Sequence, residues 1–233
     1  MAAPAFFYTE QLNDDEIILN EETSKHVVQV LRMPKGAQLN VTDGKGKKAL
    51  TSIIDDHRKK CRLKVEKIAL TDKLQPEIAI AISLLKNNAR FEWFLEKATE
   101  IGVNKIIPLL CDRTSKEKFR LDRMQNIMIS AMLQSQQCWM PGIQEPIDFN
   151  ACVSFIYEQK FIAHCEETTR TMLGSEMKAG HSKIILIGPE GDFTPTEIEL
   201  ALKYNYNPVS LGATRLRTET AGVVAATLMR NIS

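Results

Sequence analysis

The residues with the most evident chemistry lie in three short segments near the carboxyl end. An apolar run at residues 184–187 enters the sequence GPEG at residues 188–191, and a strand-like run at residues 208–211 precedes Gly212. The sequence LRTETA at residues 216–221 then opens a helix. Apolar runs that are followed by glycine-containing turns are typical of buried strands that end in loops. Glycine also lets the backbone approach a ligand closely. We therefore expect three adjacent loops that bind a small polar ligand.

Other interpretations of these segments remain open. GPEG also fits a tight strand-to-helix turn that binds nothing. Arg217 and Glu219 fit a pair of charges at a helix start, where the helix dipole favours Glu. A phosphate-binding P-loop is excluded, because no GK[ST] follows the glycines.

Composition and cysteine usage limit the class of protein. With 233 residues, 25% charged and 44% hydrophobic, the chain has ordinary globular composition and can form one α/β domain or two smaller ones. No apolar run approaches the roughly 18 residues of a membrane helix and no signal peptide opens the chain, so we expect a cytoplasmic protein. The cysteines are widely spaced without a CxxC pair, which predicts reduced, mostly buried thiols and no metal site: Cys61, Cys111, Cys138, Cys152 and Cys165.

Positive charge is concentrated in one part of the chain. The net charge is only +1, but residues 45–67 contain nine Lys or Arg against three acidic residues. Such a block favours contact with a polyanion through release of its counterions. It fits a solvated, lysine-rich hairpin equally well.

The periodicity of the chain changes near residue 72. Short alternating segments at residues 38–42, 49–54 and 61–68, with a turn at residues 43–46, predict a small antiparallel barrel. A helix over residues 24–32, stopped by Pro34, precedes these strands. The polar segment 71–76 serves as a linker. We therefore divide the chain into residues 1–72 and residues 73–233.

Strand-like and helix-like runs alternate in the second part, which favours a mostly parallel sheet covered by helices. Asn87 or Asn88 can cap the first helix, and Thr194 with Glu197 makes a capping box for the third. The expected strands cover residues 78–84, 105–109, 160–164, 183–187 and 208–211. The expected helices cover residues 90–101, 116–136, 195–203 and 218–231.

At this point the motifs carry a resemblance that runs nearly end to end. They are HVVQVLR at residues 26–32, KATEIGV at residues 97–103, IPL at residues 107–109, and then GPEG and LRTETA in that order. With these motifs the chain resembles the bacterial RsmE family, the 16S rRNA uridine-N3 methyltransferases of the SPOUT superfamily. The combination is specific, whereas each motif alone is weak.

The resemblance implies a fold and a cofactor. It implies an α/β SPOUT domain with a trefoil knot, an N-terminal PUA-like RNA-binding β-barrel, and a homodimer that completes the catalytic pocket. It also implies that S-adenosylmethionine is the methyl donor, bent within the knot, and that 16S rRNA of the small ribosomal subunit is the partner. The residues carried over to the donor site are Ile187, Gly188, Pro189, Glu190, Gly191, Ser210, Leu211, Gly212, Leu216, Arg217, Thr218, Thr220 and Ala221.

The reaction requires uracil N3 to lose a proton, and the resulting negative charge has to be stabilised. We expect Arg217, with Arg215 as a second candidate, to stabilise this charge. Glu219 would orient that cation or accept a proton. By resemblance Glu100 and Arg113 lie near the target base, although a surface ion pair fits them equally well. No histidine falls in the three carboxyl-terminal motifs, so the general base is not identified.

Several further side chains are candidates for ligand or RNA contact. His164 ends an expected strand on the ligand side, and it either contacts the donor or is a structural histidine. His26 is either an RNA contact or structural. The remaining candidates for RNA contact are Lys25, Arg32, Arg58, Lys59 and Lys60.

Two positions depart from the family pattern. Asp192 occupies the place of a second glycine after GPEG, where its side chain crowds the loop or caps the following helix. Gln137 replaces an arginine and removes one RNA-contacting charge.

Two other functions remain as alternatives. One is a SPOUT methyltransferase acting on ribose 2′-oxygen or tRNA, and the other is a non-catalytic RNA-binding or ribosome-assembly protein.

Overall fold

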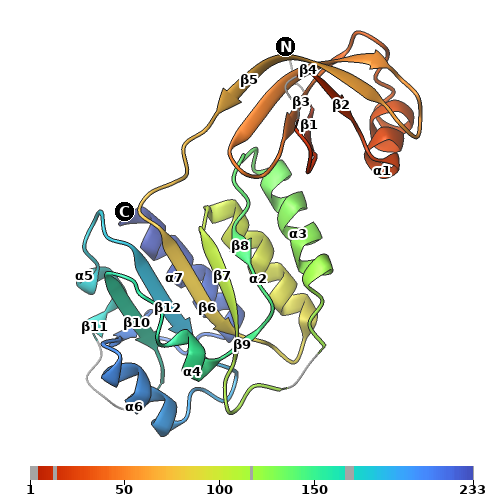
Figure 1. Cartoon of the computed structure of the whole chain (residues 1–233). Helices are drawn as coiled ribbons and strands as arrows, with labels where there is room; N and C mark the ends of the chain where they lie inside the picture. Colours follow the sequence, from red (N-terminus) through yellow and green to blue (C-terminus); the bar gives the residue numbers. More distant parts are fainter. Residues whose placement is uncertain (1–4, 13–14, 116–117, 166–170, 233) are drawn as a thin grey trace. The chain divides into compact units, whose positions relative to one another are not determined.

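The computed structural model describes residues 5–12, 15–115, 118–165 and 171–232 (Figure 1). The chain divides into two units. The first combines Met1–Lys73 with Met132–Met140, and the second combines Leu74–Ala131 with Pro141–Ser233. The sequence pattern did not predict that residues 132–140 group with the first unit.

The first unit is built on one five-stranded sheet. Its strands are β1 (Phe6–Tyr8), β2 (Glu16–Ile18), β3 (Gln38–Thr42), β4 (Lys47–Asp55) and β5 (Arg62–Leu70). Their order is β1-β3-β4-β5-β2, and the pairs β3–β4, β4–β5 and β2–β5 are antiparallel. The expected antiparallel pairing is confirmed for β3, β4 and β5, and β1, which the sequence pattern did not single out, runs parallel to β3. Alternation along β4 places Ala49 and Ile53 in the core of this unit.

The predicted first helix begins earlier and ends earlier than expected. Asn20 caps α1 (Glu21–Lys25) by accepting a hydrogen bond from the Thr23 N–H at 2.8 Å. The chain continues as a π-helical turn, η1 (His26–Val30), in which the Leu31 N–H donates to the His26 carbonyl. Arg32 then adopts a left-handed backbone with φ of 52°, which ends the helix ahead of Pro34.

The turn at residues 43–46 explains why residues 132–140 belong to this unit. The Asp43 carboxylate accepts hydrogen bonds from the N–H groups of Lys45 and Lys47, at 2.7 and 3.1 Å. Gly46 has φ of 98°, and a Cβ there would lie 2.5 Å from the Trp139 ring. The Trp139 indole donates to the Thr71 carbonyl at 2.7 Å. Glycine is therefore required at position 46 both by the backbone and by the indole against it.

The second unit is a parallel sheet, as expected. Its strands are β6 (Ile78–Ser83), β7 (Lys105–Leu110), β8 (Gly142–Ile143), β9 (Ile147–Asp148), β10 (Gln159–Ala163), β11 (Thr171–Met172), β12 (Lys183–Ile187) and β13 (Asn207–Ser210). The order is β11-β13-β10-β12-β6-β7-β8, with β9 also paired to β7. Every residue of β6 and β12 is buried, which is why both read as unbroken apolar runs.

Helices cover both faces of this sheet. They are α2 (Asn88–Ile101), α3 (Leu121–Gln134), α4 (Phe149–Cys152), α5 (Leu173–Glu176), α6 (Pro195–Lys203) and α7 (Thr218–Asn231). In Figure 1, α7 and α2 lie on one face and α4 and α6 on the other. No helix in the described ranges is long and apolar enough to span a bilayer.

The helix caps agree with the sequence, with one difference in length. Asn87 caps α2, and Thr194 with Glu197 forms the predicted capping box of α6. The helix expected over residues 116–136 covers Leu121–Gln134; residues 116–117 lie outside the described part of the chain.

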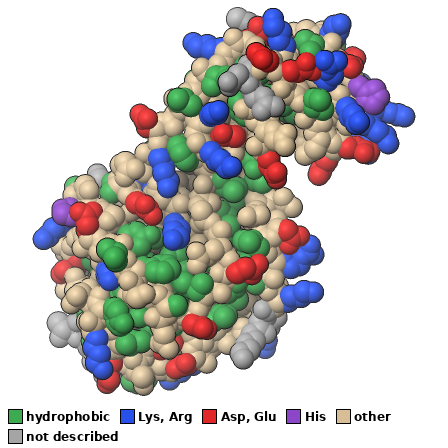
Figure 2. All heavy atoms as spheres, viewed as in Figure 1, with side chains coloured by type: hydrophobic (Ala, Val, Ile, Leu, Met, Phe, Trp, Pro, Cys, Tyr) green, Lys and Arg blue, Asp and Glu red, His purple; other side chains and the backbone are tan. Residues whose placement is uncertain are grey.

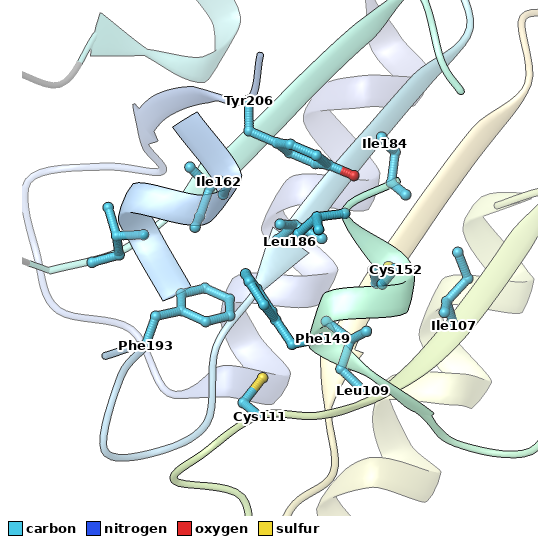
Figure 3. Close-up of a cluster of buried hydrophobic side chains, with 14 of the residues drawn as sticks. Ile107, Leu109, Cys111, Phe149, Cys152, Ile162, Ile184, Leu186, Phe193 and Tyr206 are labelled. Atoms are coloured by element: carbon cyan, nitrogen blue, oxygen red, sulfur yellow. The ribbon is translucent and has the colours of Figure 1, made fainter. Parts of the chain in front are cut away.

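The core between the sheet and α4 with α6 contains both aromatic and aliphatic side chains. Figure 3 shows Phe149 and Phe193 facing one another, and their ring centroids are 5.4 Å apart. Phe193 is completely buried although it lies only two residues beyond GPEG. Burial of this ring anchors the loop after β12 to the core.

Candidate functional site

The three segments singled out in the sequence, residues 184–191, 208–212 and 216–221, meet at one edge of the parallel sheet. They surround a cavity of about 700 Å³ at the carboxyl ends of β10, β12 and β13 and the start of α7. Open α/β sheets bind ligands at this edge. The lining residues are Arg90, Ala163, His164, Cys165, Ile187, Gly188, Pro189, Glu190, Asp192, Val209, Ser210, Leu211, Gly212, Ala213, Thr214, Arg215, Leu216, Arg217, Thr218 and Ala221.

Short polar contacts hold the loops around this cavity. The Thr218 hydroxyl donates to the Gly188 carbonyl at 3.0 Å, which ties the first turn of α7 to the loop after β12. The Ser210 hydroxyl donates to the Gly212 carbonyl at 2.9 Å within the loop after β13. A Cβ at Gly188 would lie 3.1 Å from the Phe193 ring, so a larger residue there would displace the anchored loop.

Arg90 is a charged residue of the cavity that the sequence motifs did not reveal. From the first turn of α2 its guanidinium Nη1 reaches the Glu190 carboxylate at 2.8 Å, and its Nε lies 3.7 Å from the Glu219 carboxylate. Glu219 is only 6% exposed, and its Oε2 has no hydrogen-bond partner among the described residues. The cap at Asn87 fixes where α2 starts, but no sequence signal shows that Arg90 meets residues 100 and more positions away.

Arg217 has a different environment from Arg90. It is the N-cap residue of α7 and is exposed, and its side chain makes no cap hydrogen bond. No carboxylate lies within 4 Å of its guanidinium in the described ranges, and Arg215 is exposed nearby on the same cavity. Glu219 pairs with Arg90 and not with Arg217 in this structure, and its expected role in orienting Arg217 or accepting a proton stays a prediction.

Comparison with known proteins agrees with this geometry. Residues 72–230 match the RNA methyltransferase domain family, and residues 19–66 match the RNA methyltransferase PUA domain. The ribosomal RNA small subunit methyltransferase E of Synechocystis is 31% identical over 223 residues, covering 93% of this chain and 73% of that protein. The chain belongs to the ribosomal RNA small subunit methyltransferase E family.

Further members and solved structures cover nearly the whole chain. The Bacillus subtilis member is 27% identical over 88% of this chain and 85% of its own length. A probable rRNA methyltransferase from Porphyromonas gingivalis is 34% identical, with a TM-score of 0.93 over 98% of both chains. The Neisseria gonorrhoeae methyltransferase E, bound to S-adenosylmethionine, is 26% identical, with a TM-score of 0.87 over 98% of both chains. The PUA-like sheet and the parallel α/β sheet are consistent with the SPOUT methyltransferase fold.

Most of the residues expected at the donor site in this family member line the cavity. Gly191 and Thr220 are the exceptions, although each neighbours a lining residue. His164 lines the cavity and is 4% exposed. No cluster of potential metal ligands occurs within the described residues.

Glu100 lies in a different part of the second unit. It is in the last turn of α2, where the Lys97 ammonium donates to its carboxylate at 3.2 Å. Ten residues of helix separate it from Arg90, which is about 15 Å along the axis. The structure therefore does not bring Glu100 to the cavity of its own chain.

Arg113, in the loop after β7, holds the loop that contains GPEG. Its guanidinium donates to the carbonyls of Gly191 and Phe193, at 2.7 and 3.3 Å. Asp192 does not cap α6, since Thr194 occupies that position. The contacts that Arg113 makes in this chain are with the GPEG loop, and its place near the RNA base stays a prediction.

The candidate RNA contacts of the first unit are all exposed. Figure 2 shows Lys and Arg side chains on the side of this unit that carries α1. Lys25 and Lys59 both approach the Glu21 carboxylate, at 2.7 and 3.7 Å. This shared contact brings the turn between β4 and β5, with Arg58 and Lys60, close to α1. Arg32 is exposed at the end of η1.

The cysteines are free thiols, and four of the five are buried. Burial raises the pKa of Cys61 to about 11, and of Cys111 and Cys152 to about 12. Cys165 is exposed and lines the cavity. The prediction of mostly buried thiols is confirmed.

Proposed function

We propose that this protein transfers a methyl group from S-adenosylmethionine to N3 of one uridine in 16S rRNA. The observation that carries the proposal is the cavity at the carboxyl ends of β10, β12 and β13, lined by the GPEG and LRTETA motifs with Arg217 exposed at its edge. Family membership supports the rRNA substrate, and two similar solved structures contain S-adenosylmethionine.

The cavity suits a nucleoside-like donor. Its volume of about 700 Å³ lies within the usual range for small-molecule sites. Backbone N–H and C=O groups at Gly188, Leu211 and Leu216 can hold adenine without charged side chains, while Ile187, Leu211 and Leu216 supply apolar contact. The buried Glu219 Oε2 is an additional unsatisfied acceptor beside the site. When bound, the donor supplies a methyl group on a positively charged sulfur.

Three charged residues have separate roles in the reaction that we propose. Arg217, exposed and without a carboxylate partner in the described structure, stabilises the negative charge that develops on uracil as its N3 loses a proton. Glu219, two residues further along the chain, orients the site or accepts the proton. Arg90 balances the charge of Glu219 and Glu190.

The two units take separate tasks in this proposal. Residues 1–72 form the PUA-like RNA-binding half, in which Lys25, Arg32 and residues 58–60 contact phosphates, and residues 73–233 form the methyltransferase half. The enzyme works in the cytoplasm as a homodimer, and the partner subunit completes the pocket. Family resemblance and the exposed cations of the first unit support this assignment.

Methyl transfer to small ribosomal subunits tests the proposal. The subunits come from a strain that lacks its own uridine-N3 enzyme, the donor is isotopically labelled, and the RNA is hydrolysed for nucleoside analysis. The expected product is N3-methyluridine. A 2′-O-methyl nucleoside, or transfer to tRNA alone, would assign a different SPOUT activity. Absence of both transfer and donor binding would identify a non-catalytic RNA-binding protein.

A further inference from the structure

Asp192 forms a cross-link between two walls of the cavity. Its Oδ2 accepts a hydrogen bond from the Cys165 N–H at 2.7 Å, and its Oδ1 accepts one from the Phe193 N–H at 2.8 Å. Cys165 lies two residues beyond β10, and Asp192 lies five residues beyond β12. Both residues line the cavity. One carboxylate therefore joins the ends of two adjacent strands where their loops would otherwise separate.

The backbone at this position is compatible with glycine and with Asp. Asp192 has φ of 63°, in the left-handed region, and its N–H closes a turn onto the Pro189 carbonyl at 2.9 Å. Asp and Asn tolerate this conformation better than other side chains do. Glycine would adopt the same turn but would provide neither hydrogen bond. The side chain thus adds a connection without altering the turn.

We propose that Asp192 is a positioning residue, which fixes the wall of the donor cavity between the end of β10 and the GPEG loop before the donor binds. This inference rests on the proposed function. Two further contacts hold the same loop from other directions: Arg113 bonds the Gly191 carbonyl, and the Phe193 ring is buried in the core. Asp192 is the contact that ties the loop to β10. If this wall is already ordered in the free protein, less conformational entropy is lost when the donor binds, and the donor binds more tightly.

Substitutions at position 192 separate this role from backbone strain. Asp192→Gly keeps the positive φ and removes both acceptors, whereas Asp192→Asn keeps the turn and one acceptor oxygen. In calorimetry with S-adenosylmethionine, we expect Asp192→Gly to raise the Kd about tenfold and Asp192→Asn about threefold, because they remove two and one, respectively, of the charge-assisted hydrogen bonds that order the wall. The donor KM should rise in the same proportion, while kcat stays within about twofold because reacting groups are untouched.

A matched control exists on the same two strands, at their amino ends. The Glu158 carboxylate, just before β10, accepts hydrogen bonds from the N–H and the hydroxyl of Ser182, just before β12, at 2.7 and 2.9 Å. Glu158→Ala therefore removes an equivalent cross-link at the edge away from the cavity. We expect it to lower the Tm about as much as Asp192→Gly does and to leave the donor Kd within about twofold of wild type.

Two results would overturn the inference. One is a donor Kd for Asp192→Gly within twofold of wild type. The other is an equal loss of donor affinity in Glu158→Ala, which would make the effect one of general stability. If the wild-type chain itself bound no S-adenosylmethionine, the proposed function would fail first and this inference with it, so the two failures are distinguishable.

Discussion

Among single residues, Arg217 is the one whose substitution should affect catalysis without affecting the stability of the fold. It is exposed and no carboxylate pairs with it among the described residues, so its removal leaves no buried charge behind. We expect Arg217→Ala to reduce single-turnover methyl transfer about 100-fold or more, as is usual when a donor to a developing negative charge is removed. The Tm should change by no more than about 1 °C, because exposed substitutions of this kind are close to neutral.

Arg215→Ala is the matched control for Arg217, because both arginines are exposed and line the same cavity. We expect the Arg215 variant to retain most of the activity. Wild-type turnover by Arg217→Ala would remove this residue from the mechanism. An equal loss in both variants would instead indicate that the two cations attract RNA together.

Cys165 provides a readout of cavity occupancy that does not depend on catalysis. Cys61, Cys111 and Cys152 are buried, and their raised pKa values of about 11 to 12 keep them as thiols at pH 8, where a thiolate is the reactive form. Cys165 is the exposed cysteine. We expect one thiol per native chain to react rapidly with a disulfide reagent at pH 8, and S-adenosylmethionine to slow that reaction.

The thiol assay has an internal control. Cys165→Ser should abolish the rapid phase, while the thiols that remain react only after denaturation. Rapid labelling of two or more thiols in the native protein would contradict the burial of the others. Labelling of Cys165 at an unchanged rate with saturating donor would place the donor away from the end of β10.

At the scale of elements, the packing of α7 depends on Gly222. A Cβ at this position would lie 2.6 Å from the Phe94 ring of α2 and 2.9 Å from Ile82 of β6. Alanine gains about 1 kcal/mol of helix propensity over glycine, but forcing a methyl group into a packed core costs about 1–3 kcal/mol. The net loss is therefore about 0–2 kcal/mol. Because both contacts of the new Cβ are shorter than 3.0 Å, we expect Gly222→Ala to lie in the upper half of this range and to lower the free energy of unfolding by about 1–2 kcal/mol in urea denaturation.

Gly174→Ala in α5 is the control for Gly222→Ala. There the nearest atom to a new Cβ is Ile232 Cδ1 at 3.7 Å, which is ordinary contact. This variant should be as stable as wild type or slightly more stable. If Gly222→Ala were equally stable, α7 would have room to move away from α2, and the start of α7 at Arg217 would be less firmly placed than its contacts indicate.

The elements also show which parts of the structure a sequence can predict. Buried parallel strands read as continuous apolar runs, so β6 and β12 were found nearly to the residue, and the caps at Asn87 and Thr194 marked where helices begin. These signals are local. The parallel pairing of β1 with β3 depends on contacts more than 30 residues apart, and no local pattern in β1 distinguishes it from an antiparallel strand.

In the candidate site, too, local sequence patterns predicted some residues and not others. Glycine motifs after apolar runs indicated most of the cavity lining, because strand ends and turns carry local signals. Arg90 was missed, and Glu100 lies in an ion pair with Lys97 away from the cavity, since which turn of α2 faces the cavity depends on how the helix packs on α7. The contacts of Arg113 could not be predicted from the sequence either, because its partners are backbone carbonyls 78 and 80 residues further along the chain.

At the scale of the whole molecule, the net charge of +1 conceals a basic region that RNA binding can test. Arg58, Lys59 and Lys60 are exposed in the turn between β4 and β5, and the Lys59 ammonium lies 3.7 Å from Glu21 of α1. Removing one cation that neutralises a phosphate should reduce the slope of log K against log salt by about 0.7–0.9. We expect the triple Gln variant of these residues to weaken rRNA binding and to reduce that slope by about 2.

The control removes an equal charge from the second unit, through Gln at the exposed residues Arg120, Lys178 and Lys203. Both triple variants have the same net charge, so a difference between them reports where the RNA lies rather than how much charge the protein carries. Equal slopes for the two variants would mean that only the total charge matters. A slope unchanged from wild type in the residue 58–60 variant would make this turn a solvated hairpin, and the RNA would then have to contact other cations, with Lys25 and Arg32 the next to replace.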